Sequence, residues 1–220
     1  MSPLRLVLFD CDGTLVDSAG HIVNAMEKAF AAHGLEPPSA GKVKSIIGLS
    51  LPVAVARLAA GAAAAHDDIV TAYKDFYADA AAAGAAKEPL FPGTLDAIEA
   101  IAQVAVLGVV TGKSRRGLDR ILAGHGLQRH FATTVTADDA PSKPAPDMVH
   151  LALAETGADA IHTVVVGDSA FDMEMARAAG AKAIGVSWGY HDVARLKQAG
   201  AQAFATRMAD LPQLVNECLP

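Results

Sequence analysis

Two aspartates separated by one residue, Asp10 and Asp12, directly follow the first strongly apolar run of the chain. A carboxylate nucleophile can take up a phosphoryl group as an acyl phosphate, which divides a difficult hydrolysis into two easier steps. A second carboxylate can give a proton to the leaving oxygen and then take one from water. The pattern predicts Asp10 as a nucleophile and Asp12 as a general acid and base. A plain Asp-Gly turn would account for Asp12 and Gly13, but it leaves Asp10 and Thr14 unexplained.

Two later segments carry groups suited to an anionic ligand. Thr111 and Gly112 follow the second apolar run, where a hydroxyl and free backbone amides can hold phosphate oxygens near a helix start. Taken alone this signal is weak, because Thr-Gly after a strand is commonly a simple turn. Lys143 lies in a proline-rich loop, and we expect it to balance the charge of Asp10 and of a transferred phosphoryl group. The predicted phosphate ligands are Thr14, Thr111, Gly112 and Lys143.

A fourth apolar run ends in Gly167-Asp168, and Asp172 follows four residues later on a predicted helix. Residues four apart lie on the same helix face. Magnesium prefers hard oxygen ligands and commonly takes one or two carboxylates together with a substrate phosphate. We therefore predict Asp168 as a Mg²⁺ ligand, with Asp172 supporting the site. An ordinary helix cap would explain either acid by itself.

Electrostatics links these acids to a cation. If Asp10, Asp12, Asp168 and Asp172 meet at one edge of a sheet, each close pair costs on the order of 4 kcal/mol at 4 Å and an effective dielectric constant near 20. Such a cluster repels a phosphate dianion. A divalent cation together with Lys143 would reverse the local charge and make a phosphate site feasible.

The elements that must position these residues are short apolar runs separated by segments of helical length. Their continuous rather than alternating apolarity is typical of parallel strands that are buried on both faces. We predict an α/β fold with an open, doubly wound parallel sheet and a Rossmann-like core. The predicted strands are residues 4–9, 104–110, 133–136, 163–166 and 183–186.

A long interval without a convincing strand follows the first motif. Residues 17–88 are rich in Ala, Leu, Val and Ile at helical spacings, and the interval is too long for a simple crossover helix. We predict a helical cap at 17–88, inserted into an α/β catalytic core formed by 1–16 and 89–220. The connections are expected at 16–18 and 84–93, where glycine and proline interrupt helices.

The composition restricts the class of protein. Of the 220 residues, 52% are hydrophobic and 19% are charged, which is typical of a globular domain. The net charge of −6 and the lack of a basic run argue against a nucleic-acid partner. No membrane span or signal peptide is expected, and the two cysteines form no paired framework, so we predict a cytoplasmic protein. Both a monomer and a homodimer remain open.

The combined motifs resemble those of the haloacid dehalogenase superfamily. The first motif is Asp10 to Thr14, the second Thr111, the third Lys143 with Pro144, and the fourth Gly167-Asp168 through Asp172. The resemblance implies a Mg²⁺-dependent phosphatase that forms an aspartyl-phosphate, with a cap of the C1 type. It also implies metal ligation by Asp10, by the carbonyl group of Asp12 and by Asp168.

The segment with Trp188 and Tyr190 resembles the phosphoglycolate phosphatase branch, so 2-phosphoglycolate is the expected substrate. Gly112 departs from the pattern, because many relatives carry Asn there. A sugar-phosphate mutase similar to β-phosphoglucomutase and a pyrophosphatase are the alternatives. The cap histidine of the mutase branch would align with Ile22, whereas the histidine here is His21, which favours hydrolysis. A phosphate-binding module without catalysis is disfavoured by the intact acids.

Overall fold

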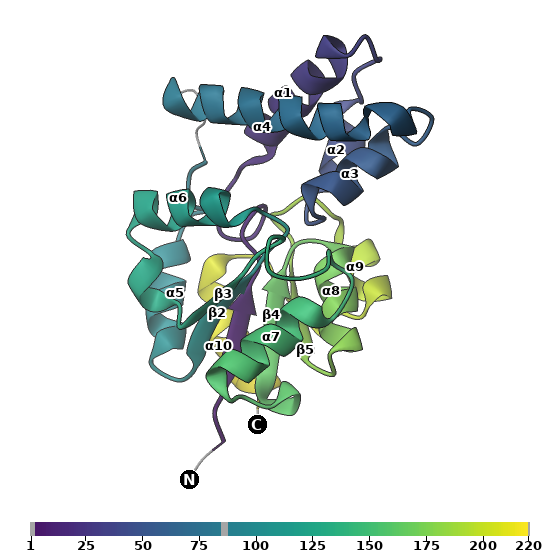
Figure 1. Cartoon of the computed structure of the whole chain (residues 1–220). Coiled ribbons are helices and arrows are strands. Elements are labelled where there is room, and N and C mark those ends of the chain that lie inside the picture. The colour runs from purple at the N-terminus through teal and green to yellow at the C-terminus, as the bar shows by residue number, and fades with distance from the viewer. Residues whose placement is uncertain (1–2, 85–87, 220) are drawn as a thin grey trace.

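The computed structural model describes residues 3–84 and 88–219. A single six-stranded sheet forms the centre, with the strand order β3-β2-β1-β4-β5-β6 and parallel pairing throughout (Figure 1). This confirms the predicted α/β class with a parallel sheet. The strands are β1 (Leu6–Phe9), β2 (Val106–Val110), β3 (Thr133–Val135), β4 (Thr163–Gly167), β5 (Lys182–Val186) and β6 (Ala203–Ala205).

Five of these strands fall on the predicted runs, and β6 was not predicted. Its residues are Ala203, Phe204 and Ala205, and alanine has a low strand propensity. The strand forms because Ile184 to Val186 of β5 offer a backbone edge for parallel pairing. The pairing with β5, rather than the sequence of residues 203–205, therefore determines that this segment is a strand.

Helices cover both faces of the sheet, as its buried strands require. Val7 and Phe9 of β1 face a hydrophobic core shared with α5, α6 and α10, while Leu6 and Leu8 face a second core shared with α7, α8 and α9. Successive side chains of a strand point to opposite faces, so one four-residue strand serves both cores. The helices are α5 (Thr94–Ala102), α6 (Arg115–His125), α7 (Asp147–Thr156), α8 (Ala170–Ala178), α9 (Val193–Ala199) and α10 (Leu211–Cys218), with short 3₁₀ turns at η2 (Gln128–His130), η3 (Ala160–His162) and η4 (Met208–Asp210).

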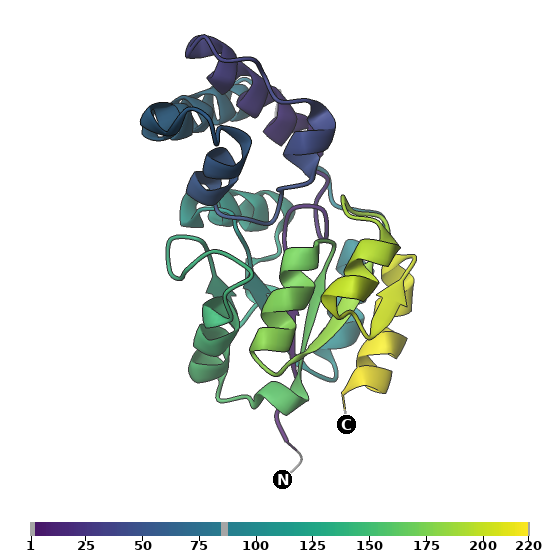
Figure 2. The ribbon, with the colours of Figure 1, turned by 90° about the vertical axis from the view of Figure 1, so that its right-hand side faces the viewer.

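Four further helices lie beyond the edge at which the strands end, above the sheet in Figures 1 and 2. They have a hydrophobic core of their own, which includes Ile22, Met26, Phe30, Val55 and Ile69. The division of the chain into a core of 1–16 and 89–220 and a cap of 17–88 stays a prediction. The helices are α1 (Ala19–Ala32), α2 (Ala40–Lys44), α3 (Leu51–Leu58) and α4 (His66–Ala82), with the 3₁₀ turn η1 (Ala63–Ala65).

The two connections to these helices run side by side. The backbone amide of Asp17 donates to the carbonyl oxygen of Pro89 at 2.9 Å, and that of Phe91 donates to Leu15 at 3.0 Å. Val16 and Leu90 form an antiparallel bridge between them. The predicted first connection lies here; residues 85–87 of the predicted second connection lie outside the described part of the chain. None of the helices in 3–84 and 88–219 combines the length and apolarity needed to cross a membrane.

Candidate active site

Asp10 lies directly beyond β1, where its backbone amide donates to the carbonyl oxygen of Val166 at 2.9 Å. The side chain is 1% exposed. Its Oδ1 accepts a hydrogen bond from Nζ of Lys143 at 2.7 Å. Its Oδ2 is buried and has no hydrogen-bond partner among the described residues. One carboxylate oxygen is thus held in place, and the other is free for a nucleophilic or metal-binding role.

Lys143 is fully buried between two carboxylates. Besides Asp10, its Nζ donates to Oδ1 of Asp172 at 2.5 Å. Oδ2 of Asp172 accepts hydrogen bonds from the amide and hydroxyl of Ser169, at 3.0 and 2.6 Å. The amide of Asp172 donates back to the Ser169 hydroxyl at 3.3 Å, and this bond and the one from the Ser169 amide form a capping box at the start of α8. Because both oxygens of Asp172 are engaged, the geometry favours a role in orienting Lys143.

Asp168 follows β4 and is held by two hydrogen bonds. The hydroxyl of Thr14 donates to its Oδ1 at 3.1 Å, and the amide of Tyr190 donates to its Oδ2 at 2.9 Å. Gly13 has a φ of +86°, and a Cβ atom there would lie 2.4 Å from Oδ2 of Asp168, so only glycine fits. The Thr14 hydroxyl thus helps to orient Asp168, and its role as a phosphate ligand stays a prediction.

Three of the four acids that were predicted to converge lie together, and the side chain of Asp12 is not among them. One carboxylate oxygen from each of Asp10, Asp168 and Asp172 lies within 4.8 Å of the other two. Burial raises the pKa of Asp10 to about 7 against the opposing effect of Lys143, and burial also raises the pKa of Asp168 well above its usual range. One lysine does not offset this crowding of negative charge. The free Oδ2 of Asp10 and the hard oxygen donors fit a Mg²⁺ ion.

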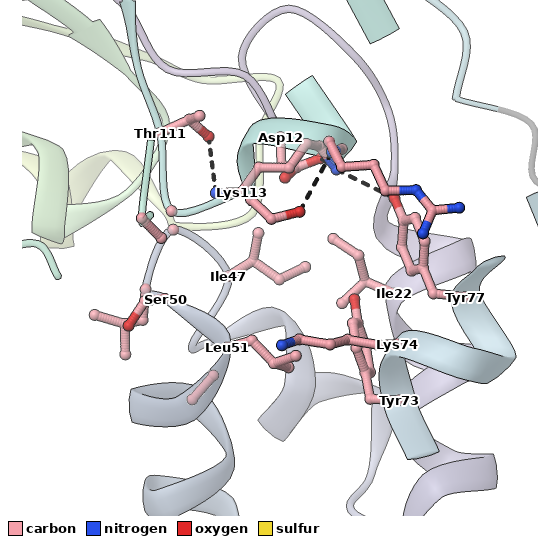
Figure 3. Close-up of a pocket in the computed structure, with 18 of the residues that line it drawn as sticks. Asp12, Ile22, Ile47, Ser50, Leu51, Tyr73, Lys74, Tyr77, Thr111 and Lys113 are labelled. Carbon is pink, nitrogen blue, oxygen red and sulfur yellow. Dashed lines mark hydrogen bonds and ion pairs between the residues drawn. The ribbon is translucent and has the colours of Figure 1, made fainter. Parts of the chain in front are cut away.

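Asp12 points to a different partner. Its Oδ1 forms an ion pair with Nζ of Lys113 at 2.9 Å, and both side chains are largely buried (Figure 3). Its side chain does not belong to the cluster of three acids in the described part of the chain. Ligation of the metal through the Asp12 carbonyl group stays a prediction. Lys113 was not assigned a role from the sequence, although its position two residues after Thr111 is a signal that could have identified it.

A buried polar network continues from Lys113 to the helices above the sheet. Glu88, with a side chain 3% exposed, lies 3.4 Å from Nζ of Lys113. Its carboxylate also accepts hydrogen bonds from the hydroxyl of Tyr77 and from Nη2 of Arg120. Nζ of Lys113 donates to the Tyr77 hydroxyl at 3.1 Å. The network joins α4, the second connection and α6 beside Asp12.

A cavity of about 850 Å³ lies over the sheet edge. Asp10, Asp12, Thr111 and Gly112 contribute to its floor, and the loop of Gly48, Leu49 and Ser50 contributes to its upper wall. Apolar side chains of α1, α3 and α4 make up much of that wall, and they include Ile22, Leu51 and Tyr73 (Figure 3). Met26 of α1 also lines the cavity. The site thus combines a charged floor with a mainly apolar upper wall, which we call the roof.

Gly112 permits close approach of this loop. A Cβ atom at residue 112 would lie 2.5 Å from the carbonyl oxygen of Gly48 and 2.6 Å from that of Leu49. The Asn that the resemblance leads us to expect at this position would also carry a Cβ atom and would collide with the loop in the same way. Glycine at position 112 therefore allows the Gly48–Leu49 loop to approach the sheet edge closely.

We expect Gly112→Ala to push the Gly48–Leu49 loop away and to lower kcat/KM roughly 10- to 100-fold, since small displacements of positioning groups have effects of this size. Steady-state kinetics measures the loss. Gly124→Ala is the matched control, because Gly124 lies in α6 with no atom within 4 Å of an added Cβ. An unchanged kcat/KM for Gly112→Ala would contradict the close fit.

Comparisons with known proteins identify the family of the chain. Residues 7–186 match the model of the family described as haloacid dehalogenase-like hydrolase. The chain is 34% identical over 211 residues to the probable phosphatase IndB of Dickeya dadantii, covering 94% of this chain and 91% of that protein. It is 32% identical over 198 residues to a phosphoglycolate phosphatase of Agrobacterium fabrum, covering 88% and 84%. The solved structure of a predicted phosphoglycolate phosphatase from Haemophilus somnus has a TM-score of 0.83, with 25% identity and coverage of 97% and 99%.

The chain belongs to the haloacid dehalogenase-like hydrolase family. The resemblance drawn from the motifs is confirmed. Within that family it is a phosphatase, which confirms the predicted enzyme class.

Proposed function

We propose that the protein is a Mg²⁺-dependent phosphomonoester hydrolase that works through an aspartyl-phosphate on Asp10. The main support is the geometry of Asp10, with Oδ1 held by Lys143, Oδ2 unpartnered among the described residues, and Asp168 close by. Asp10 and Asp168, with the Asp12 carbonyl group, would hold the ion. When bound, Mg²⁺ offsets the negative charge of the acids and polarises the phosphoryl group.

The side chains support a two-step displacement. Oδ2 of Asp10 attacks phosphorus while the bond to the leaving oxygen breaks, and Asp12 gives that oxygen a proton. Asp12 then takes a proton from water, whose oxygen attacks phosphorus and releases inorganic phosphate and the Asp10 carboxylate. Lys143 would balance the charge of Asp10 and the phosphoryl group, and Thr111 and Gly112 would hold phosphate oxygens on the cavity floor.

For the substrate, we propose 2-phosphoglycolate as the first candidate, because several relatives at about 30% identity bear the name phosphoglycolate phosphatase. The cavity of about 850 Å³ is also wide enough for a monoester with a larger apolar group. Larger apolar monoesters therefore belong in the same screen. We keep the cytoplasm as the expected compartment, with no nucleic acid or membrane partner.

The residues near the mutase position favour hydrolysis over mutase chemistry. Ile22 lines the cavity, so an aliphatic side chain stands where the mutase branch has a histidine. His21 packs on Tyr77, with 3.8 Å between the ring centroids and 3.2 Å between its Nε2 and the Tyr77 carbonyl oxygen. Burial lowers the pKa of His21. The described cavity wall does not include it.

A substrate screen with Mg²⁺, read as released phosphate, tests the proposal. It includes 2-phosphoglycolate, pyrophosphate, β-glucose 1-phosphate and benzyl phosphate, each with the wild-type protein and with Asp10→Asn. We expect phosphate release from at least one monoester, and no release with the variant. Isomerisation of β-glucose 1-phosphate without release would favour the mutase. Phosphate binding without any turnover would favour the non-catalytic module.

A further inference from the structure

Lys113 forms an ion pair with Asp12, the predicted general acid. Its Nζ lies 2.9 Å from Oδ1 of Asp12 in an environment that excludes most water, since the two side chains are 7% and 11% exposed. A buried charge pair is screened much less by solvent than an exposed one, so it can fix a side chain in one orientation. Oδ1 of Asp12 is paired with Lys113 by charge and has no aligned hydrogen-bond partner among the described residues, which leaves Oδ2 for a proton transfer.

Lys113 is itself held at both ends. Its backbone amide donates to the hydroxyl of Thr111 at 3.3 Å. Its stem passes over Gly117, where an added Cβ would lie only 2.8 Å from Cγ of Lys113. Its Nζ contacts Tyr77 and Asp12 (Figure 3). It also contacts Glu88. The lysine therefore has little freedom to reach another partner.

Glu88 limits how strongly Lys113 acts on Asp12. The ammonium group lies between two carboxylates, at 2.9 Å from that of Asp12 and 3.4 Å from that of Glu88. Arg120 on the far side of Glu88 completes an alternating row of charges. Each carboxylate has a cation beside it, and Lys113 is shared between the two. Because Glu88 shares the positive charge of Lys113, the lysine can orient Asp12 while it stabilises the ionised form of Asp12 less strongly.

We propose that Lys113 is a positioning residue that aims Asp12 at the leaving-group oxygen, with Glu88 holding Lys113 in place. This inference rests on the proposed function, because it assumes that Asp12 protonates the leaving group. The effect of Lys113 must then depend on how much the leaving group needs a proton. A purely structural role, or a direct contact with the phosphoryl group, would affect all substrates alike.

The test compares 4-nitrophenyl phosphate with benzyl phosphate, two aromatic monoesters of similar size that the cavity can accept. Nitrophenolate leaves readily without a proton, whereas a benzyl alkoxide requires one. For Lys113→Met we expect kcat/KM to fall roughly 100-fold on benzyl phosphate, within the range that general acid catalysis contributes, and about threefold or less on 4-nitrophenyl phosphate. The ratio between the substrates is measured on one preparation, so it does not depend on the fraction of folded enzyme.

Three controls sharpen the result. Lys113→Arg keeps the charge and should recover most of the loss on benzyl phosphate. Arg115→Met removes another cation at the start of α6, one that pairs with Asp139 at 2.5 Å, and should leave the ratio unchanged. In an Asp12→Asn background, Lys113→Met should change the ratio less than about twofold, because coupled residues are not additive.

An equal loss on both substrates would overturn the assignment of Lys113. Lys113→Met leaves the carboxylates of Asp12 and Glu88 without their shared cation, which can prevent folding. The double variant Lys113→Met with Glu88→Gln removes one of these charges, and we expect the same ratio for it. The proposed function fails separately, if wild-type turnover of 4-nitrophenyl phosphate does not depend on Asp10. A normal Asp10-dependent rate with an unchanged ratio would therefore refute only the role of Lys113.

Discussion

Asp10→Asn should lower turnover by a factor of at least about 10⁴ and abolish the covalent phosphoenzyme, because removal of a nucleophile has effects of this order or larger. An amide cannot form an acyl phosphate, yet it has nearly the same size as the carboxylate. Lys143 keeps its ion pair with Asp172 in the variant, so its charge stays paired. Released phosphate gives the rate, and mass spectrometry of protein quenched in acid detects the phosphorylated residue.

Asp96→Asn is the matched control for this experiment. Asp96 lies exposed on α5, outside the described cavity wall, and the same chemical change there should leave the rate within about twofold of wild type. Thermal unfolding of both variants shows whether the fold persists. A phosphoenzyme that still forms on Asp10→Asn would place the nucleophile elsewhere and contradict the mechanism.

Removal of divalent cations should reduce turnover at least about 1,000-fold, and Mg²⁺ should restore it, since the ion supplies the main electrostatic stabilisation of transferred phosphoryl charge. Binding to the folded state also stabilises it. At 100 times the dissociation constant, the gain is about 2.7 kcal/mol, which corresponds to an increase in Tm of roughly 5–10 °C for a chain of this size. Kinetics and thermal melts with EDTA and with Mg²⁺ measure both effects.

Asp168→Asn identifies the site of that ion. The variant removes a charge but keeps one acceptor oxygen, which can take the hydrogen bond from the Tyr190 amide, while its NH₂ group can donate to the hydroxyl of Thr14. We therefore expect activity to stay low at saturating Mg²⁺ and the Tm increase to be largely lost. Asp159→Asn, an exposed position before β4, serves as the control and should respond to Mg²⁺ as wild type does. A full Tm increase in Asp168→Asn would show that the cation binds elsewhere.

Much of the core could be predicted from the sequence because parallel strands bring their carboxyl ends to one edge. Each motif follows an apolar run, and that order alone places Asp10 near Asp168 once the runs pair as β1 and β4. Continuous apolarity identified five strands, because both faces of each are buried. The strand β6 lacks that signal, since its alanines pair through backbone groups only in the folded sheet.

The contacts between the sheet edge and the helices above it could not be predicted in this way. The pair of Lys113 with Asp12 joins segments far apart in the chain, and no local spacing encodes it. Arg57 of α3 illustrates the same limit, because its guanidinium lies 5.2 Å from the centre of the Phe171 ring and the residue is not among those that line the cavity. Long charged side chains reach many partners, so packing decides among them.

The paired connections beside the first motif have a consequence for how the protein can diversify. Hydrogen bonds from Asp17 to Pro89 and from Phe91 to Leu15 bring the chain back to the place from which it departed. A helical segment of another length or sequence can therefore be exchanged between these points without changing the register of the sheet. The helices above the sheet can therefore change during evolution while the acids at the sheet edge keep their positions.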